Sequence, residues 1–298
     1  MNTNLVPASQ QTFSSTIEAF IQKHPVLSFY SVVFLISWGG FFLAVGPTTS
    51  MEVVNIPLIA VVSLAAGPIV AGLLMTAIVY GRAGFREFRS RLFKWRVPAR
   101  WYAIALVPAP LLLGSILLAL SSLESPDFLP GIITAKDKIT FLLFNITIAL
   151  VAGLLEEIGW TGFAVPTLRR HYGVFATGII AGVFWGAWHF LGNVAAAETV
   201  SGTLSVPVFL ALILLSLLAG SSVAFRVLMV WVYDRTGSLL VAILMHMSYT
   251  AAVRILNPVN EGVPLLIYGF TSDIAWWIAV AVVAVASGRQ LTRQPVMR

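Results

Sequence analysis

The chain has 298 residues, of which 58% are hydrophobic and only 10% are charged. Soluble domains carry about 25% charged residues, so this composition excludes an ordinary soluble protein and indicates a polytopic membrane protein. The absence of cysteine excludes disulfides and thiolate metal sites, and the distribution of the basic residues behind the net charge of +6 argues against a nucleic-acid partner.

The N-terminal segment 1–25 is polar, and Phe13, Ile17, Phe20 and Ile21 within it would share one helical face. This pattern predicts a short amphipathic helix at the membrane interface, although a disordered tail fits it equally well. The apolar run that follows is too long for the hydrophobic region of a cleavable signal peptide. We therefore expect that run to be the first membrane span.

Eight apolar segments have the length of about 20 residues that a bilayer-spanning helix needs. We therefore expect an all-α integral membrane protein, with about eight transmembrane helices around a polar intramembrane cavity. These helices would form one membrane domain over 26–290, followed by a basic tail at 291–298. The predicted spans are 26–46, 56–80, 101–120, 139–160, 175–193, 206–230, 238–256 and 266–286.

Basic residues cluster on one side of the predicted spans, as Lys and Arg do in cytoplasmic loops. An even number of spans then puts both termini in the cytoplasm, and the compact chain without a eukaryotic targeting signal suggests a bacterial cell membrane. The segment after the second span, which we also expect to contact anionic lipid, is the most basic. It carries Arg82, Arg86, Arg89, Arg91, Lys94, Arg96 and Arg100.

The stretch VAGLLEEIGWTGF, residues 151–163, ends an apolar run with two adjacent carboxylates, Glu156 and Glu157. An acidic side chain at the centre of a membrane helix costs roughly 2.5 to 3.5 kcal/mol, so ionisable groups in spans are candidates for function. His189 in FWGAWHF and His246 in AILMHMSYTAA are the other strong candidates.

Three further charged residues in the predicted spans are less informative. Arg226 is near the end of the sixth span. Arg254 and Asp273 are expected near span ends, where snorkelling or interfacial water accounts for a charge.

The fifth span carries a pattern of small residues, because Gly178, Gly182 and Gly186 recur every four positions. This spacing predicts close packing of the span against a neighbouring helix. It would also let another backbone approach His189.

Helical geometry assigns different surroundings to the two glutamates. Glu156 and Glu157 point about 100° apart on a helix of 3.6 residues per turn. One is therefore expected to face the cavity with the histidines, and the other to have a structural partner or a proton. Trp185 and His189, four residues apart, share a helix face.

The residue types leave several chemistries open. A carboxylate and an imidazole can activate water as a general base, and a second imidazole with a hydroxyl, here His246 and Thr250 on one helix face, can stabilise an oxyanion. This set suggests hydrolysis of an amide bond inside the membrane. Glu156, His189 and His246 could equally hold Zn²⁺, relay protons in a transporter, or serve as polar contacts between helices.

Three short motifs resemble those of the CPBP (CAAX-protease and bacteriocin-processing, or Abi) family of intramembrane glutamic endopeptidases. WGAWH resembles the second motif, Phe-x-x-x-His, through His189, and HMSYT resembles the third, His-x-x-x-Asn, through His246. The motif core covers about 150–255. EEIGWTGFAVPTL resembles the first motif, Glu-Glu-x-x-x-Arg followed by Gly-Phe and Pro-x-Leu, through Glu156, Glu157, Gly162, Phe163, Pro166 and Leu168.

The resemblance implies roles for individual residues. Family members are glutamate-dependent endopeptidases, and the eukaryotic ones trim a C-terminal tripeptide from prenylated proteins. Glu156 would be the general base and His189 would hold and polarise the attacking water. His246 and Thr250 would stabilise the oxyanion, and Glu157 would be a structural carboxylate. No cofactor would be required, although a divalent metal such as Zn²⁺ remains an alternative through Glu156, His189 and His246.

The sequence departs from the family pattern at three positions. Trp185 replaces a phenylalanine, Thr250 replaces an asparagine, and Thr161 stands where the first motif has its arginine. Glu157 therefore lacks a cation four residues along its own helix. Either Glu157 is neutral or its cation comes from Arg169, Arg170 or Arg226.

The predicted spans put Glu156 and His189 at different depths. With 1.5 Å per residue, Glu156 comes at the end of its span and His189 about 20 Å into the next. Either the span boundaries are displaced by a turn or more, or residues 160–174 dip into the membrane. We favour the second interpretation, a short helix broken at Pro166 and Gly173.

The combined pattern predicts an intramembrane endopeptidase acting on a peptide or membrane-protein substrate in the lipid bilayer. Prenylated C-termini, bacteriocin leaders and membrane-protein segments all fit as substrates, and the oligomeric state is open. One alternative is a catalytically degenerate family member that serves as a membrane binding or self-immunity protein, as Thr161 and Thr250 suggest. Another is a proton-coupled transporter, against which the absence of a visible inverted repeat counts.

Overall fold

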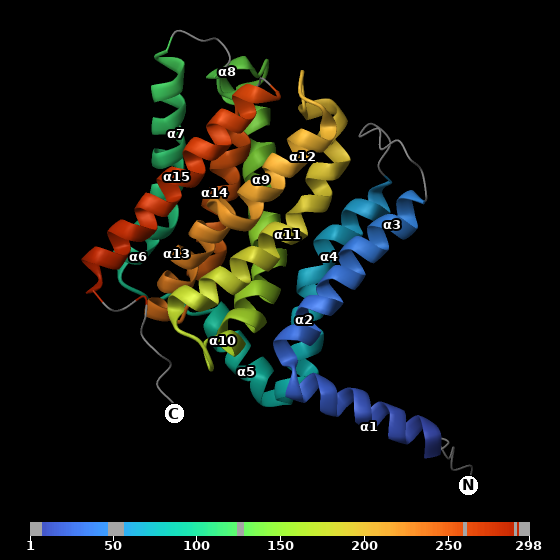
Figure 1. The fold of residues 1–298 in the computed structure, drawn as a ribbon. Coiled ribbons are helices and arrows are strands. Elements are labelled where there is room, and N and C mark those ends of the chain that lie inside the picture. Colours follow the sequence, from blue (N-terminus) through green and yellow to red (C-terminus); the bar gives the residue numbers. More distant parts are fainter. Residues whose placement is uncertain (1–7, 47–56, 124–127, 259–260, 289–290, 292–298) are drawn as a thin grey trace.

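The computed structural model describes residues 8–46, 57–123, 128–258, 261–288 and 291. Within these residues every regular element is a helix (Figure 1). Eight helical segments of the described chain are long and apolar enough to cross a membrane, which confirms the predicted all-α, multi-pass integral membrane protein. They are Pro25–Val45, Leu58–Leu92, Ala99–Ser121, Lys138–Leu168, Val174–Val200, Val206–Thr236, Leu239–Leu256 and Val263–Ala286.

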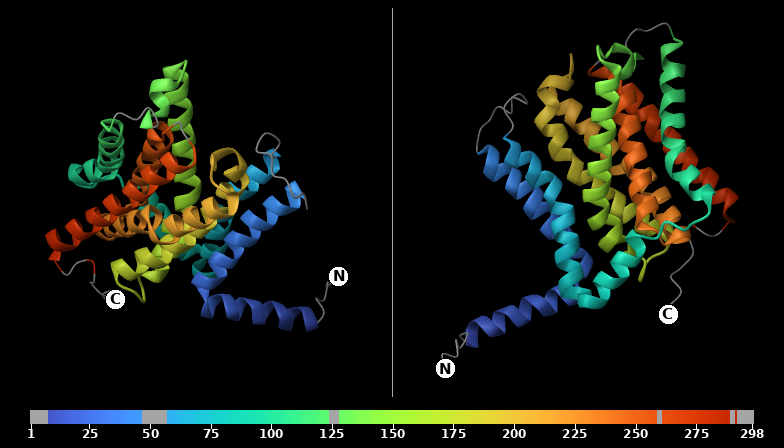
Figure 2. Two further views of the ribbon diagram at one scale, coloured as in Figure 1. Left: turned by 45° about the horizontal axis from the view of Figure 1, so that its top comes forward. Right: turned by 180° about the vertical axis from the view of Figure 1, so that it is seen from behind.

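Most of these segments consist of two or three shorter helices joined end to end. In Figures 1 and 2 they form a bundle, and α1 projects from one end of it. The elements are α1 (Ala8–Lys23), α2 (Pro25–Phe34), η1 (Leu35–Gly39), α3 (Gly40–Val45), α4 (Leu58–Met75), η3 (Thr76–Tyr80), α5 (Gly81–Leu92), α6 (Ala99–Leu106), α7 (Pro108–Ser121), α8 (Gly131–Thr134), α9 (Lys138–Gly159), η5 (Trp160–Ala164), α10 (Val165–Leu168), α11 (Val174–Val200), α12 (Val206–Ala219), α13 (Ser221–Thr236), α14 (Leu239–Leu256) and α15 (Val263–Ala286).

Local capping signals fix where two of the helices that carry the site, α9 and α14, begin. Asp137 caps α9, because its carboxylate accepts the backbone N–H groups of Ile139 and Thr140, each at 3.1 Å. The hydroxyl and N–H of Thr140 hold the pKa of Asp137 below its usual value. Ser238 caps α14 by accepting the N–H of Val241 at 3.2 Å.

The fourth span is longer than predicted, and this corrects the expected break at Pro166. Helix α9 continues through η5 and α10 to Leu168, with Pro166 in the first turn of α10. Glu156 therefore lies about 18 Å before the end of the span, and His189 about 22 Å after the start of α11. The depth conflict disappears because the predicted boundary was two turns short.

The sixth span is interrupted at Gly220, where a carboxylate from α15 caps the next helix. The Asp273 carboxylate accepts the backbone N–H of Ser221 at 2.6 Å and also the Ser221 hydroxyl. A side chain at Gly220 would overlap this carboxylate. Asp273 is only 7% exposed and about 15 Å into α15, so the expectation that it lies near a span end was wrong.

The glycine pattern of the fifth span produces the predicted close packing. A Cβ atom at Gly178 or Gly182 would lie 2.5 or 2.7 Å from backbone atoms of α13. A Cβ at Gly186 would overlap the carbonyl oxygen of Leu217 in α12. Helix α11 therefore packs directly against α12 and α13.

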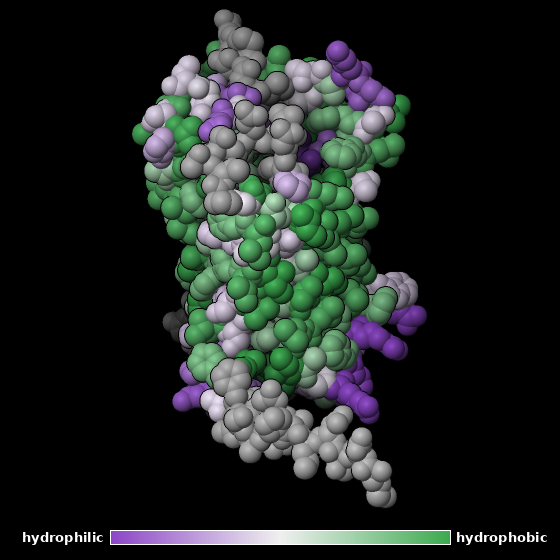
Figure 3. Space-filling model, turned by 90° about the vertical axis from the view of Figure 1, so that its right-hand side faces the viewer, coloured by the Kyte–Doolittle hydropathy of each residue, from purple (hydrophilic) through white to green (hydrophobic). Residues whose placement is uncertain are grey.

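The surface separates an apolar middle from polar ends. In Figure 3 hydrophobic residues cover the middle of the bundle and hydrophilic ones gather toward its ends. The basic helix α5 lies at the same end as α10 and α1 (Figure 1), so that end is the predicted cytoplasmic side. Residues 8–23 are helical, with Ile17 and Phe20 exposed, whereas the predicted basic tail lies outside the described residues except for Leu291.

Candidate active site

Glu157 is fully buried and is surrounded by donors from three other elements. Arg226 of α13 donates from Nη1 to both carboxylate oxygens, at 2.8 and 2.9 Å. His246 of α14 lies with Nδ1 2.7 Å from Oε1, and the Thr161 hydroxyl of η5 donates to Oε2. Glu157 is thus the glutamate with structural partners.

The cation of Glu157 is one of the three arginines that the sequence made candidates. Arg226 provides it, and its side chain is 0% exposed. Arg169 instead pairs with Asp234 at 2.7 Å, and the guanidinium of Arg170 lies 4.4 Å from the ring centroid of Tyr80. The positive charge missing at Thr161 therefore comes from another helix, and Thr161 contributes a hydroxyl.

Glu156 is held by a different partner. The indole N–H of Trp185 donates to Glu156 Oε2 at 2.8 Å. The same indole ring lies 4.3 Å from the Arg226 guanidinium carbon, a distance typical of a cation–π contact. Trp185 therefore does more than replace the phenylalanine of the motif, because it links the Arg226–Glu157 pair to Glu156.

His246 stands between the two glutamates. Its Nδ1 contacts Glu157, and its Nε2 lies 3.8 Å from Glu156 Oε2, beyond hydrogen-bond distance. A carboxylate only accepts, so Nδ1 carries the hydrogen in this contact. The Glu157 contact therefore fixes the ring orientation and leaves Nε2 on the side of Glu156.

His189 is oriented by its own helix. Its Nδ1 lies 2.9 Å from the backbone oxygen of Trp185, an acceptor, so Nδ1 is the donor. Nε2 of the neutral ring is then free to accept a hydrogen bond. The rings of Trp185 and Trp188 meet the imidazole edge-on, with centroids 4.8 and 4.7 Å away, and fix its plane.

A cavity of about 360 Å³ brings together Glu156, His189 and Thr250, whereas His246 is not among its lining residues. Its walls come from α9, α11, α12, α13 and α14. This volume lies in the range of ligand pockets. The polar lining of the cavity includes Glu156, Trp185, His189, Asn193, Thr250 and Arg254.

The sequence analysis missed Asn193 and discounted Arg254. Each lies on the same helix face as a predicted site residue, because Asn193 follows His189 by four residues and Arg254 follows Thr250 by four.

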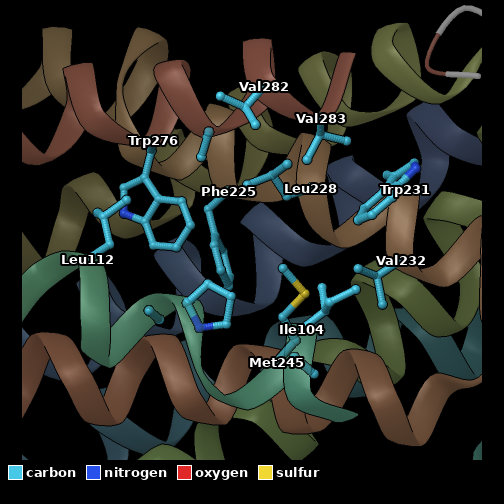
Figure 4. Close-up of a pocket in the computed structure, with 14 residues that line it drawn as sticks. Ile104, Leu112, Phe225, Leu228, Trp231, Val232, Met245, Trp276, Val282 and Val283 are labelled. Carbon is cyan, nitrogen blue, oxygen red and sulfur yellow. The ribbon is translucent and has the colours of Figure 1, made fainter. Parts of the chain in front are cut away.

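A second cavity, apolar and of about 350 Å³, is shown in Figure 4. Aromatic side chains lie between it and the first cavity. Phe225 stacks on Tyr249 with ring centroids 4.2 Å apart, and Trp276 contacts both rings. Tyr249 lines the first cavity, whereas Phe225 and Trp276 line the second. The polar groups therefore all lie on one side of this wall.

The described side chains do not have the geometry of a metal site. Among the residues that the structure describes, no three His, Asp or Glu side chains converge as ligands. His246 Nδ1 and His189 Nδ1 are already hydrogen-bonded, to Glu157 and to a backbone oxygen. In the described structure Glu156, His189 and His246 are therefore not arranged around a common centre.

Two comparisons bear on the identity of the chain. Residues 138–252 match the sequence model of a family described as type II CAAX prenyl endopeptidase Rce1-like. A protein named CAAX prenyl protease 2, from Methanococcus maripaludis, is 27% identical over 173 residues, which cover 55% of this chain and 59% of that protein. These matches support its membership in the CPBP/CAAX family.

The family match covers the predicted catalytic positions of this chain. The segment 138–252 runs from the start of α9 to two residues past Thr250, and it also contains Arg226. It ends before Arg254. The alignment with the Methanococcus protein spans less than two thirds of that relative, so its activity as a whole protein is carried over only as a proposal.

Proposed function

We propose that this chain is an intramembrane endopeptidase of the CAAX protease type, which hydrolyses a peptide bond with water activated by Glu156 and His189. One observation carries the proposal. Glu156 accepts the Trp185 indole N–H and lines the same cavity as His189, while the neighbouring Glu157 is matched by the charge of Arg226. A single buried carboxylate without a cationic partner is thus left facing the cavity.

The proposed reaction uses these groups in sequence. Water hydrogen-bonded to Glu156 and to Nε2 of His189 transfers a proton to the Glu156 carboxylate as its oxygen attacks the carbonyl carbon. The Thr250 hydroxyl, and His246 when protonated at Nε2, stabilise the oxyanion that forms. Glu156 returns its proton to the leaving amine as the carbon–nitrogen bond breaks.

The substrate we propose is a peptide or membrane-protein segment reached within the bilayer. The Methanococcus relative is named as a CAAX prenyl protease, which makes a lipidated C-terminal peptide the first substrate to test. The mechanism needs no cofactor. We place both termini in the cytoplasm on the basis of the basic loop, and the membrane itself remains the bacterial cell membrane expected from the sequence.

The test is cleavage of a quenched-fluorescent peptide library, including prenylated peptides, by the detergent-purified protein. Glu156→Gln and His189→Ala are each expected to lower kcat by at least 1000-fold. Matched controls are Glu198→Gln and His171→Ala, exposed residues outside the cavity whose loss should leave kcat within twofold of the wild type.

Two further outcomes of this experiment, the effect of a chelator and the absence of any cleavage, separate the proposal from its alternatives. A chelator should leave the activity unchanged, and loss of activity on chelation would assign Glu156, His189 and His246 to a metal. A folded wild type that cuts nothing in the library would overturn the proposal in favour of a non-cutting family member.

A further inference from the structure

Arg254 is a cation at the cavity that the proposed chemistry does not use. Among the side chains that line this cavity, it is the only Lys or Arg. It lies in the last turn of α14 and is exposed. Among the described residues no carboxylate forms an ion pair with it. A guanidinium without an ion-pair partner at the cavity that holds the reacting groups points to an anionic ligand.

A hydrogen bond to Asn145 positions the guanidinium of Arg254. Its Nε donates to Asn145 Oδ1 at 2.9 Å, and Asn145 is 4% exposed and donates to the backbone oxygen of Phe141 at 2.8 Å. One of the five guanidinium N–H groups is used in this way. The two Nη groups form the planar fork that binds a carboxylate in a bidentate manner.

Helix α14 also sets the distance between this cation and the reacting groups. His246, Thr250 and Arg254 follow one another at intervals of four residues, so they lie along one helix face in steps of about 6 Å. His246 lies beside Glu156. Thr250, which lines the cavity, lies between His246 and Arg254 along α14. Arg254 is therefore about 12 Å along the helix axis from His246.

We propose that Arg254 binds the free C-terminal carboxylate of the peptide substrate and so selects the bond that reaches Glu156. This inference rests on the proposed function and adds a specificity-determining residue to it. An extended peptide advances about 3.3 Å per residue, so 12 Å corresponds to three or four residues between the carboxylate and the cleaved bond. The apolar wall formed by Ile148, Ala152 and Val253 suits apolar side chains in that segment.

The first test measures binding, so that it does not depend on turnover. Fluorescence anisotropy of a fluorescein-labelled heptapeptide with four apolar C-terminal residues is measured with the Glu156→Gln protein, using the free acid and the C-terminal amide. The acid should bind at least 10-fold more tightly than the amide. Adding Arg254→Gln should reduce this preference to less than twofold without changing the affinity for the amide, and Arg254→Lys should retain part of it.

The control is Arg170→Gln, which removes an arginine outside the cavity and should leave the preference intact. Equal binding of acid and amide, or no binding of either, overturns the inference. A loss of affinity for both peptides in Arg254→Gln also overturns it, because that result indicates a structural role.

The second test measures cleavage by the wild type. The free acid should have a kcat/KM at least 10-fold above the amide, mainly through KM, and residues added at the C-terminus should move the cut by the same number of positions. Cleavage at the same internal bond regardless of the C-terminus overturns the role of Arg254 and leaves the proposed function standing. Preferential binding of the acid without any cleavage supports Arg254 and overturns the proposed function.

Discussion

Arg226 and Glu157 form a fully buried ion pair that joins α13 to α9 across 69 residues of sequence. The family motif has its arginine four residues after the second glutamate, where this chain has Thr161. The cation that the motif has on the glutamate's own helix is thus supplied here from a neighbouring helix.

We therefore predict that an arginine at position 161 can compensate for the loss of Arg226. Arg226→Met should destabilise the protein by about 3–5 kcal/mol, because it leaves the Glu157 carboxylate buried without a cation. Introducing Thr161→Arg into Arg226→Met should recover much of that loss and much of the activity. Unfolding in detergent and peptide cleavage would be measured side by side.

Arg169→Met is the matched control, because its pair with Asp234 is partly exposed and should contribute less than about 1 kcal/mol. A double variant no more stable than Arg226→Met would mean that an arginine at position 161 cannot supply the cation for Glu157.

The indole N–H of Trp185 is expected to matter for catalysis. Trp185→Phe keeps an aromatic ring, as in the family motif, but removes the donor to Glu156. A hydrogen bond to a charged group contributes about 1.5–3 kcal/mol, so kcat should fall by about 10- to 100-fold with little change in KM. A variant with an unchanged kcat would show that the ring alone is sufficient.

Thr250 is predicted to contribute through its hydroxyl. Thr250→Val preserves shape and removes the donor proposed for the oxyanion, so kcat should fall by about 100-fold. Thr250→Asn should retain activity, because it supplies the amide of the family motif. Thr271→Val is a suitable control, since that exposed hydroxyl donates to its own helix at 2.7 Å. Equal activity of Thr250→Val and wild type would remove Thr250 from the site.

The glycines of α11 give a stability prediction. Gly186→Val would force a side chain into the carbonyl of Leu217, and overpacking of this kind typically costs about 1–3 kcal/mol. Gly192→Ala, on the same helix with no atom within 4 Å of the added Cβ, should be neutral or slightly stabilising. Thermal unfolding of both proteins measures the contrast, and similar midpoints would contradict the packing of α11 on α12.

The contribution of the Asp273 carboxylate, which caps α13, to the stability of the protein should also be measurable. Asp273→Leu removes the acceptor for the Ser221 N–H and hydroxyl, which should cost about 1–3 kcal/mol of stability. Asp273→Asn should cost less, because its amide oxygen still accepts. Ser272→Ala, whose hydroxyl bonds only its own helix, is the neighbouring control. An unaffected Asp273→Leu would show that the start of α13 is satisfied by another group.

The sequence by itself determined the class of fold and most of the residues of the candidate site. Apolar length identifies membrane spans because the bilayer fixes how many residues a helix needs. The same physics makes buried Glu156, Glu157, His189 and His246 conspicuous, since a charge in a span is costly unless it has a use. The three motifs then added the resemblance to the CPBP family.

The tertiary structure alone decided the pairings between helices. Nothing in the sequence distinguishes Arg226 from Arg169 or Arg170 as the partner of Glu157, because the choice depends on how α13 crosses α9. Asp273 and Arg254 were likewise expected to be unremarkable charges near span ends, because their partners Ser221 and Asn145 belong to other helices. The length of a span follows from local hydropathy, whereas the partner of a buried charge follows from the packing of helices that are distant in sequence.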